Sequence, residues 1–525
     1  MYPTTEAYKD AVYEQDVGRK VAARVRFDIS DVTAEGDVST ITTTTEAASV
    51  SQKAQVNNDV LATTYNLATL EQDRFKLDGS YSFPDATAAN NGETGFVSDS
   101  LCDASGVFSA PQTITIVFGG LHTSAGITVT FDQFNNEYAT EFNVSVFDAS
   151  DVLIESVDVT GNTLAICPVF GSFLAYKKVV VTINEWSIGN RRARVLEVDF
   201  GFIAVYTGDQ LINLNMIEEM DMTTGALPSP EFRFTIDNSD RLFNILNPTG
   251  YVKYLQQRQE VIAELGVELA NGLYEYVPLG KYLLWEWTSE EGALTASFTC
   301  RTNLDLMANF DYEQLTADSQ SLHDLAVQTF VTCGITNYSL DAALSSITTN
   351  SMAKKTDCRS LLQMIAIAGR CNIYVTRDNV ITLKQVSLGS DVDRVDFDNV
   401  YNEPKIELER IVKQVDVTYW TDLDTSATSS VAASGVDIGD VLKLDGNTLI
   451  NNSTVAEDVA DWILAQKQYR AKYSINWRGN PAHELADVIA IENSYGVDMN
   501  AMITKTELIY EGYLQARTEA KGAVN

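Results

Sequence analysis

Acidic side chains are the residues of this chain that could most readily do chemistry. Two runs bring carboxylates close together in the sequence: Asp148, Asp151 and Glu155, then Asp391, Asp393, Asp396 and Asp398. Grouped carboxylates can bind calcium or hydrolyse glycosidic bonds. Neither run has a recognised ligand spacing, and the second lacks the glycine that an EF-hand loop requires. We therefore expect solvated turns, with no metal site and no catalytic residue.

Histidine and cysteine offer little further material for catalysis. His122, His323 and His483 lie far apart in the sequence, so we expect structural roles rather than a zinc site or a nucleophile and base. The six cysteines are widely spread and form no C-x-x-C pair: Cys102, Cys167, Cys300, Cys333, Cys358 and Cys371. Cysteines spread in this way indicate small, buried, apolar side chains in a protein made in a reducing cytosol. The sequence predicts no cofactor and no enzyme.

The composition favours a large, acidic, multidomain protein. A chain of 525 residues with 45% hydrophobic residues is too long for a single core. Its 72 acidic residues exceed its 37 basic ones, a net charge of -35 that repels nucleic acid and anionic membranes. The densest basic group, Arg191, Arg192 and Arg194, is expected to be solvated or paired with Glu197 and Asp199. No apolar run is long enough for a membrane span, and the N-terminus lacks the apolar core of a secretory signal.

The elements that must position these residues are mainly strands. Residues 1–90 begin with an amphipathic helix in the first fifteen residues, followed by an extended Thr/Ser/Ala/Val stretch from Val32 to Thr64 that needs pairing partners. Residues 91–205 contain six alternating segments between Gln112 and Phe202, separated by turn residues. Six regularly spaced strands without a helix predict a jelly-roll β-sandwich.

The remaining sequence alternates between strand and helix patterns. Residues 206–312 read as a first β-barrel, and residues 313–388 as a small α+β domain with helices at 321–334 and 357–371 and a hairpin over 377–379. Residues 389–525 read as a second barrel, interrupted by a Ser/Thr/Ala linker at 421–435 and a helix at 455–469. The predicted fold is therefore mainly β and multidomain, with two barrels flanking the α+β domain and an inserted sandwich.

Three segments carry motifs that can be compared with a known family. The first is EFRFTIDNSDRLFN with the later PLG strand; the second comprises the two helices with NIYVTRDNVITL; the third is AHELADVIAIEN with the closing strand YLQARTEAKG. Together they resemble the tail-tip or baseplate hub proteins of Gram-positive siphophages. The segment TYNLATLEQDRFKLDGSYSFP is also similar to residues that precede the sandwich in these proteins. The resemblance implies a homotrimer whose two tube-type barrels per chain continue a six-fold tail tube and let DNA pass at infection.

It further implies a virion protein assembled in the host cytoplasm, with distal tail, tape measure and fibre proteins as partners. Many relatives carry a peptidoglycan-cleaving domain after the hub; since this chain stops near Asn525, we expect no lysin role. The acidic surplus has two interpretations: a channel wall that repels DNA, or a solubilising outer surface.

Residues 112–202 resemble galactose-binding-like sandwiches, in which sugars lie against loops at one end. The resemblance implies host-glycan contact, for which side chains able to stack or hydrogen-bond are candidates: Asn135, Asn136, Tyr138, Trp186 and Asn190. Trp186 is expected to seal the sandwich rather than stack on sugar. The alternatives are a non-viral lectin-like surface protein, in which the sandwich is the working part, and a glycan hydrolase that uses the scattered carboxylates.

Overall fold

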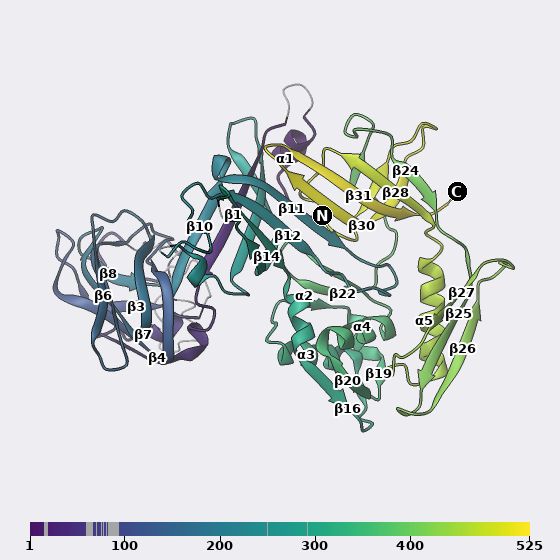
Figure 1. Cartoon of the computed structure of the whole chain (residues 1–525), viewed down its shortest axis with the longest axis horizontal. Coiled ribbons are helices and arrows are strands. Elements are labelled where there is room, and N and C mark those ends of the chain that lie inside the picture. Colours follow the sequence, from purple (N-terminus) through teal and green to yellow (C-terminus); the bar gives the residue numbers. More distant parts are fainter. Residues whose placement is uncertain are drawn as a thin grey trace. The chain divides into compact units, whose positions relative to one another are not determined.

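A computed structural model describes residues 1–14, 19–58, 67–69, 71–74, 76, 78–79, 81, 94–248, 250–290 and 292–524. The chain forms two compact units. Unit one comprises residues 1–25, 206–240 and 261–525, and unit two comprises residues 26–205 and 241–260. Figure 1 traces the strands and helices, and both units consist mainly of strands (Figure 1). The predicted mainly β, multidomain fold class is confirmed, while the five domain boundaries stay predictions.

Unit one is built on one open sheet rather than two barrels. Its strands lie in the spatial order β1 (Val21–Ser30), β13 (Glu260–Glu268), β14 (Tyr274–Thr288), β15 (Thr295–Arg301), β12 (Glu231–Asp237), β11 (Leu211–Glu219), β30 (Met499–Tyr510), β31 (Leu514–Gly522), β28 (Ala471–Trp477) and β24 (Lys405–Leu408). Beside β30 lies β29 (Val488–Ile491), which pairs with β23 (Asp393–Val395).

The expected closed barrels are wrong for the strands that the structure describes. On one edge β11 pairs with β12, from the predicted first barrel, and on the other it pairs with β30, from the predicted second barrel. Because both edges of β11 are used in this way, the two sets of strands join side to side. The same strands therefore form one continuous wall.

Alternation of apolar and polar residues gives this sheet two different faces. In β12, Phe232, Phe234 and Ile236 are buried, while Arg233 between them is exposed. Phe234 stacks on Phe298 of β15 with ring centroids 4.8 Å apart. Such cross-strand aromatic pairs fix the register of neighbouring strands. The opposite face is left polar.

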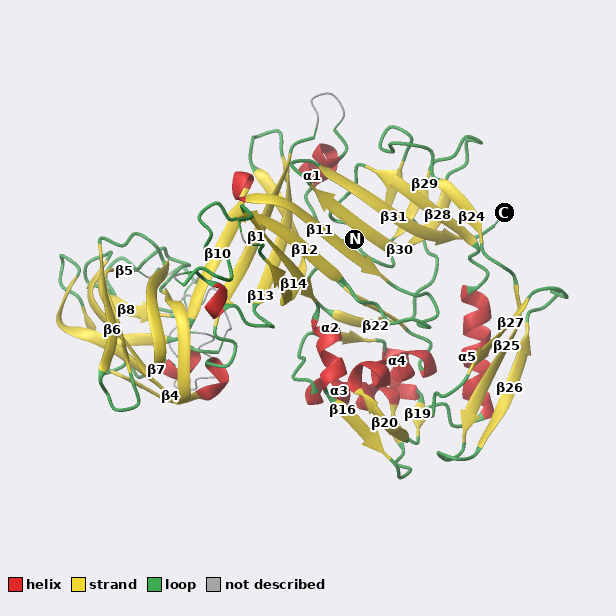
Figure 2. Ribbon diagram, viewed as in Figure 1, coloured by secondary structure: helices red, strands yellow, loops and turns green. Residues whose placement is uncertain are grey.

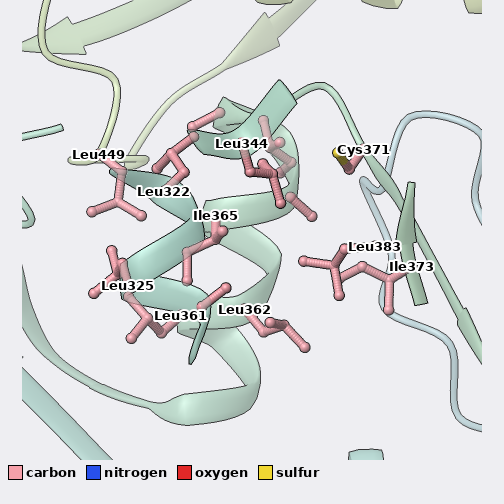
Figure 3. Packing of buried hydrophobic residues seen from close by; sticks show 14 of the residues in the cluster. Leu322, Leu325, Leu344, Leu361, Leu362, Ile365, Cys371, Ile373, Leu383 and Leu449 are labelled. Carbon is pink, nitrogen blue, oxygen red and sulfur yellow. The ribbon is translucent and has the colours of Figure 1, made fainter. Parts of the chain in front are cut away.

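The small α+β part contains the two predicted helices and the hairpin. Helix α3 (Leu322–Thr332) is capped by Ser321 and helix α4 (Cys358–Ala368) by Asp357, each accepting a hydrogen bond from a backbone N–H of the first turn. Figure 3 shows leucine and isoleucine side chains of the two helices meeting in a common core (Figure 3). The other elements are α2 (Asn303–Leu306), β16 (Asp311–Gln314), β17 (Gln320–Ser321), β18 (Tyr338–Leu340), β19 (Thr348–Thr349), β20 (Ala353–Asp357), β21 (Asn372–Val375) and β22 (Ile381–Lys384).

The predicted Ser/Thr/Ala linker at 421–435 is wrong in part: its middle seven residues form a strand. Strand β25 (Val412–Trp420) pairs with β26 (Ser426–Ala432) on one edge and with β27 (Asp440–Leu444) on the other. Helix α5 (Ser453–Gln466) lies along this sheet (Figure 2). Val431 of β26 packs against the core that α3, α4 and α5 share, so this contact and the pairing with β25 hold a strand that its composition alone does not identify.

Unit two contains the segment for which a sandwich was predicted, and this segment forms two sheets. Its larger sheet has the order β2 (Val38–Thr43), β4 (Val107–Thr130), β7 (Ile166–Trp186), β5 (Ala139–Phe147) and β6 (Leu153–Thr160), with β9 (Glu197–Asp199) also beside β4. The second sheet pairs β3 (Phe96–Leu101) with β8 (Arg192–Val195), whereas β10 (Gly201–Thr207) pairs with β1 at the end of the unit-one sheet. The first two predicted strands form the single long β4, because Gly119 and Gly120 stay extended instead of turning.

The N-terminal predictions are partly confirmed. Helix α1 (Glu6–Val12) buries Tyr8, Ala11 and Val12 against Val267, Val277 and Ala482. In the extended stretch β2 pairs with β4 of its own chain, and residues 59–64 lie outside the described part. The turn predicted at Asp78-Gly79 is described, whereas several of its neighbours are not. Single-turn 3₁₀ helices are η1 (Glu35–Asp37), η2 (Lys53–Gln55), η4 (Gly208–Gln210), η5 (Val252–Tyr254), η6 (Met307–Asn309) and η7 (Ala342–Ser346).

Candidate functional site

The five predicted glycan-contacting residues gather around two loops of the sandwich. Asn135, Asn136 and Tyr138 lie between β4 and β5, whereas Trp186 ends β7 and Asn190 follows it. The loops are joined by two hydrogen bonds: the Tyr138 N–H donates to Ser187 Oγ at 3.0 Å, and the Ser187 N–H donates to the Tyr138 carbonyl at 2.8 Å. The structure therefore brings these residues to one region of the sandwich.

Their exposure differs strongly. Asn135 and Asn136 are exposed, and Tyr138 is half-buried. Trp186 is only 2% exposed; it meets Phe131 edge-on at 5.7 Å, and its Nε1 donates to Glu137 Oε2 at 3.1 Å. A tryptophan held in this way closes the core and offers no open ring face to a ligand.

A charged segment that the sequence reasoning missed lies against the same loops. We call Glu71, Gln72 and Arg74 the clip. The Arg74 guanidinium lies 2.5 Å from Asp132 Oδ2 and 2.9 Å from Glu137 Oε1, and both carboxylates are buried. The side-chain amide of Asn190 donates to Gln72 Oε1 at 3.3 Å. The clip therefore covers part of the region where the predicted glycan-contacting residues lie.

The other end of the clip is Glu71, which is 2% exposed. Both guanidinium Nη atoms of Arg194 donate to its carboxylate, and the Arg192 N–H donates to Oε1 at 2.7 Å. Burial disfavours the charged form and raises the pKa of Glu71. The Arg194 guanidinium and these hydrogen bonds have the larger effect, and together they lower the pKa of Glu71 to about 2. Glu71 is thus an ionised, fully bonded carboxylate inside the protein.

The expected partners of the arginine group were wrong. Arg194 pairs with Glu71, the Arg191 Nε lies 3.2 Å from Glu137 Oε1, and Arg192 lies 3.7 Å from Asp99. The predicted partners were Glu197 and Asp199. The E-x-x-R spacing of Glu71 and Arg74 was the available signal, but only the tertiary fold places those residues opposite Arg194 and Glu137.

The carboxylate runs occupy turns and a buried polar cluster. The Asp148 carboxylate accepts hydrogen bonds from the N–H groups of Ser150 and Val152, and Asp151 forms an ion pair with Lys178 at the surface. Asp393 Oδ2 accepts hydrogen bonds from Tyr13 Oη at 2.6 Å and Asn480 Nδ2 at 3.1 Å, and it lies 2.7 Å from His483 Nε2. Throughout the described residues no group of three or more His, Cys, Asp or Glu side chains is arranged to hold a metal ion.

The histidines differ in their surroundings. His122 is 5% exposed, and its two ring nitrogens lie 2.9 Å from Asp31 and 2.9 Å from Asp37. His483 is buried beside Trp477, while His323 lies at the surface of α3. His122 and His483 thus act in packing and hydrogen bonding within the fold.

The polar face of the unit-one sheet is balanced in charge between β15 and β24. From β15 to Glu409, just after β24, cross-strand register places seven basic and seven acidic side chains on this face: Arg233, Arg301, Lys405, Lys472, Lys505, Arg517 and Lys521, with Glu219, Glu231, Asp237, Glu407, Glu409, Glu507 and Glu519. Neighbouring strands are linked by ion pairs such as Lys505–Glu219 at 3.2 Å and Lys472–Glu519 at 2.9 Å. This part of the sheet therefore carries none of the acidic surplus of the chain.

Strand β24 forms an open edge of that sheet. The Glu409 N–H donates to the Arg470 carbonyl at 2.9 Å, and in the register that follows, the odd-numbered residues of β24 are bonded to β28. The N–H and C=O groups of Ile406 and Leu408 therefore point away from the sheet. Both side chains are more than half exposed, and Ile406 borders an apolar cavity of about 250 Å³ with Phe397 and Tyr473. An exposed edge of this kind can accept another strand.

No helix in the described part of the chain is long and apolar enough to cross a lipid bilayer. No family model matches the sequence, and no curated protein does.

Solved structures with a similar course of the chain include two tail proteins. One is the tail protein from Neisseria meningitidis MC58, with 10% identity, 61% of this chain and 93% of that chain covered, and a TM-score of 0.43. Another is the 43 kDa tail protein of prophage MuSo2 from Shewanella oneidensis, with 10% identity, coverage of 60% and 94%, and a TM-score of 0.40.

A third similar structure is a chitosan-binding module from a Paenibacillus sp. IK-5 chitosanase/glucanase, with 11% identity, coverage of 33% and 98%, and a TM-score of 0.21. All three are likenesses of shape between chains that share few residues.

Proposed function

We propose that this chain is a non-enzymatic virion structural protein, a trimeric tail-tip hub of the Gram-positive siphophage kind, which closes the tail tube and lets DNA pass. The observation that carries the proposal is the continuous sheet of unit one. It joins the strands of both predicted barrels into one polar wall, on which seven basic and seven acidic side chains lie between β15 and β24. Two of the three hub motifs, the one around β12 with its loop Asn238 to Asn244 and the one that closes on β31, belong to this sheet and its loops, and the remaining motif lies in the small α+β part.

A neutral, ion-paired wall suits a passage for DNA. Phosphates bind to unpaired lysine and arginine clusters and are repelled by acidic surfaces. Here each basic side chain has an acidic neighbour, as in Arg517–Glu507 at 3.2 Å. DNA beside such a wall would be neither held nor expelled. For the part from β15 to β24, we favour this balanced wall over the acidic wall, because its basic and acidic side chains are equal in number.

The joint between copies, in this proposal, includes the open edge at β24. Two chains that each carry a net charge of -35 repel one another over most of their surface. The β24 edge combines unpaired backbone groups, exposed Ile406 and Leu408, and the balanced pair Lys405 and Glu407. Strand addition there would bury apolar surface without bringing like charges together.

Light scattering and electron microscopy test the trimer. The purified full-length protein should have three times the chain mass of 57.8 kDa and form ring-shaped particles. A stable monomer at high concentration would overturn the hub proposal.

The β24 joint is tested by Leu408→Pro. This change removes an N–H that points out of the sheet and leaves the bonds from β24 to β28 in place, so it should abolish the trimer and preserve the fold. Leu408→Val is the matched control. A trimer that persists in Leu408→Pro would exclude β24 from the joint.

Host-glycan contact through the sandwich is an accessory part of the proposal. Of the predicted residues, Asn135 and Asn136 offer exposed amides, while Trp186 supports the core beneath them. A glycan array of the full-length protein and of Asn136→Ala tests this contact. Binding that is lost in Asn136→Ala supports the contact; no binding by either protein, with the trimer intact, would remove the sandwich from the proposal and leave the hub.

A further inference from the structure

Two cysteines of the small α+β part lie together although 25 positions separate them. Cys333 is the C-cap of α3, and Cys358 is the first residue of α4. The two helices pack against each other, Cys333 packs against the core that contains Cys358, and each thiol is near enough to shift the pKa of the other. The fold has therefore already brought both sulfur atoms to one place.

The surroundings of the pair are unequal. Cys358 is fully buried in the core of α3 and α4, whereas Cys333 is half-buried and packs at the margin of that core. Burial raises the pKa of Cys333 to about 12 and also raises the pKa of Cys358. Because the thiolate is the reactive form, the reduced pair reacts slowly at neutral pH and stays reduced in a cytosol.

We propose that Cys333 and Cys358 form a disulfide once the protein leaves a reducing compartment. A low-molecular-weight disulfide such as oxidised glutathione is the oxidant. The more accessible Cys333 thiolate attacks it, forming a mixed disulfide and releasing one glutathione thiolate. The Cys358 thiolate then attacks the Cys333 sulfur, forming the protein disulfide and releasing the second glutathione thiolate. Two protein thiols are oxidised, two glutathiones are reduced, and the two thiol protons go to solvent.

The link would tie the end of α3 to the start of α4 and close a loop that contains β18, η7, β19 and β20. Cross-linking restricts the unfolded chain, so the stability of the small α+β part should rise. For a loop of this length we expect the thermal transition of that part to move up by roughly 5 to 10 °C. The bond would thus stabilise this part of the protein outside the cell, whatever the role of the whole chain.

Peptide mapping of the full-length protein tests the proposal. The protein is purified with reductant, exchanged into a buffer with oxidised glutathione, alkylated and digested with trypsin without reduction. The expected product joins the Cys333 peptide to the short peptide Thr356–Arg359, while the other four cysteines are alkylated. The rate should rise about tenfold for each pH unit between 7 and 9, because the thiolate fraction does.

Cys371→Ser is the matched control, since it removes another buried core cysteine and should leave both the cross-link and the shift in melting temperature. Cys333→Ser should abolish both. Six alkylated cysteines in the folded wild-type protein after prolonged oxidation would overturn the proposal. So would a mixed disulfide with glutathione at Cys333 that Cys358 never displaces.

Discussion

Replacing Glu71 by Gln should destabilise unit two by removing the negative charge that Arg194 needs. The pKa of Glu71 is lowered from 4.5 to about 2 in the folded protein, chiefly by the Arg194 guanidinium working against burial. A depression of that size corresponds to about 3 kcal/mol of stability at neutral pH, at 1.36 kcal/mol per pKa unit. Glu71→Gln should lose about that amount, because the Arg194 guanidinium remains buried without a counter-charge.

The dependence on pH follows from the direction of the shift. Since the folded pKa lies below the unfolded one, the contribution of Glu71 is complete above about pH 4.5 and is lost as the pH falls towards 2. The difference in stability between wild type and Glu71→Gln should therefore be largest at pH 6 to 7 and shrink steadily in acid.

Hydrogen exchange measured by mass spectrometry is the suitable assay, because it reports unit two separately. Peptides from β4 and β7 should show an opening free energy lower by about 3 kcal/mol in Glu71→Gln at pH 7. Asp151→Asn is the matched control: Asp151 pairs with Lys178 but is 77% exposed, so its loss should cost under about 1 kcal/mol. Equal protection of Glu71→Gln and wild type at pH 7, or a difference unchanged in acid, would refute the reasoning.

Three further changes test other contacts. Arg377 is buried and lies 2.7 Å from Glu218, so Arg377→Met should lower the free energy of unfolding of unit one, measured by calorimetry, by about 3 to 5 kcal/mol. The double variant Arg377→Met with Glu218→Leu should recover much of that loss. A double variant whose loss equals the sum of the two single losses would contradict this. Gly201→Ala would place a Cβ 2.3 Å from the Ser30 Cα and should lower the melting temperature by several degrees, whereas Gly36→Ala, with nothing within 4 Å, should not. His122→Phe keeps a ring but loses the contacts to Asp31 and Asp37, so amides of residues 31–38 should exchange faster; unchanged exchange there would show that His122 acts through packing alone.

Local patterns in the sequence were enough to identify most elements. Ser321 and Asp357 stand three residues before backbone N–H donors of helices with apolar periodicity, and both helices form where that pattern predicts. Alternation likewise predicted β5, β12 and β25. The candidate site was harder to predict, because the burial of Trp186 depends on Glu137, 49 positions away, and the clip brings Gln72 to Asn190 across 118 positions.

The sequence by itself determined that the protein is acidic, mainly β and multidomain, because charge, composition and short-range periodicity are properties of neighbouring residues. Only the tertiary structure decided that the two predicted barrels form one sheet, that residues 426–432 are a strand, and that Arg194 pairs with Glu71. The physical reason is common to all three. Strand pairing and buried ion pairs depend on which distant segments share an edge or a core, and no local pattern records that choice.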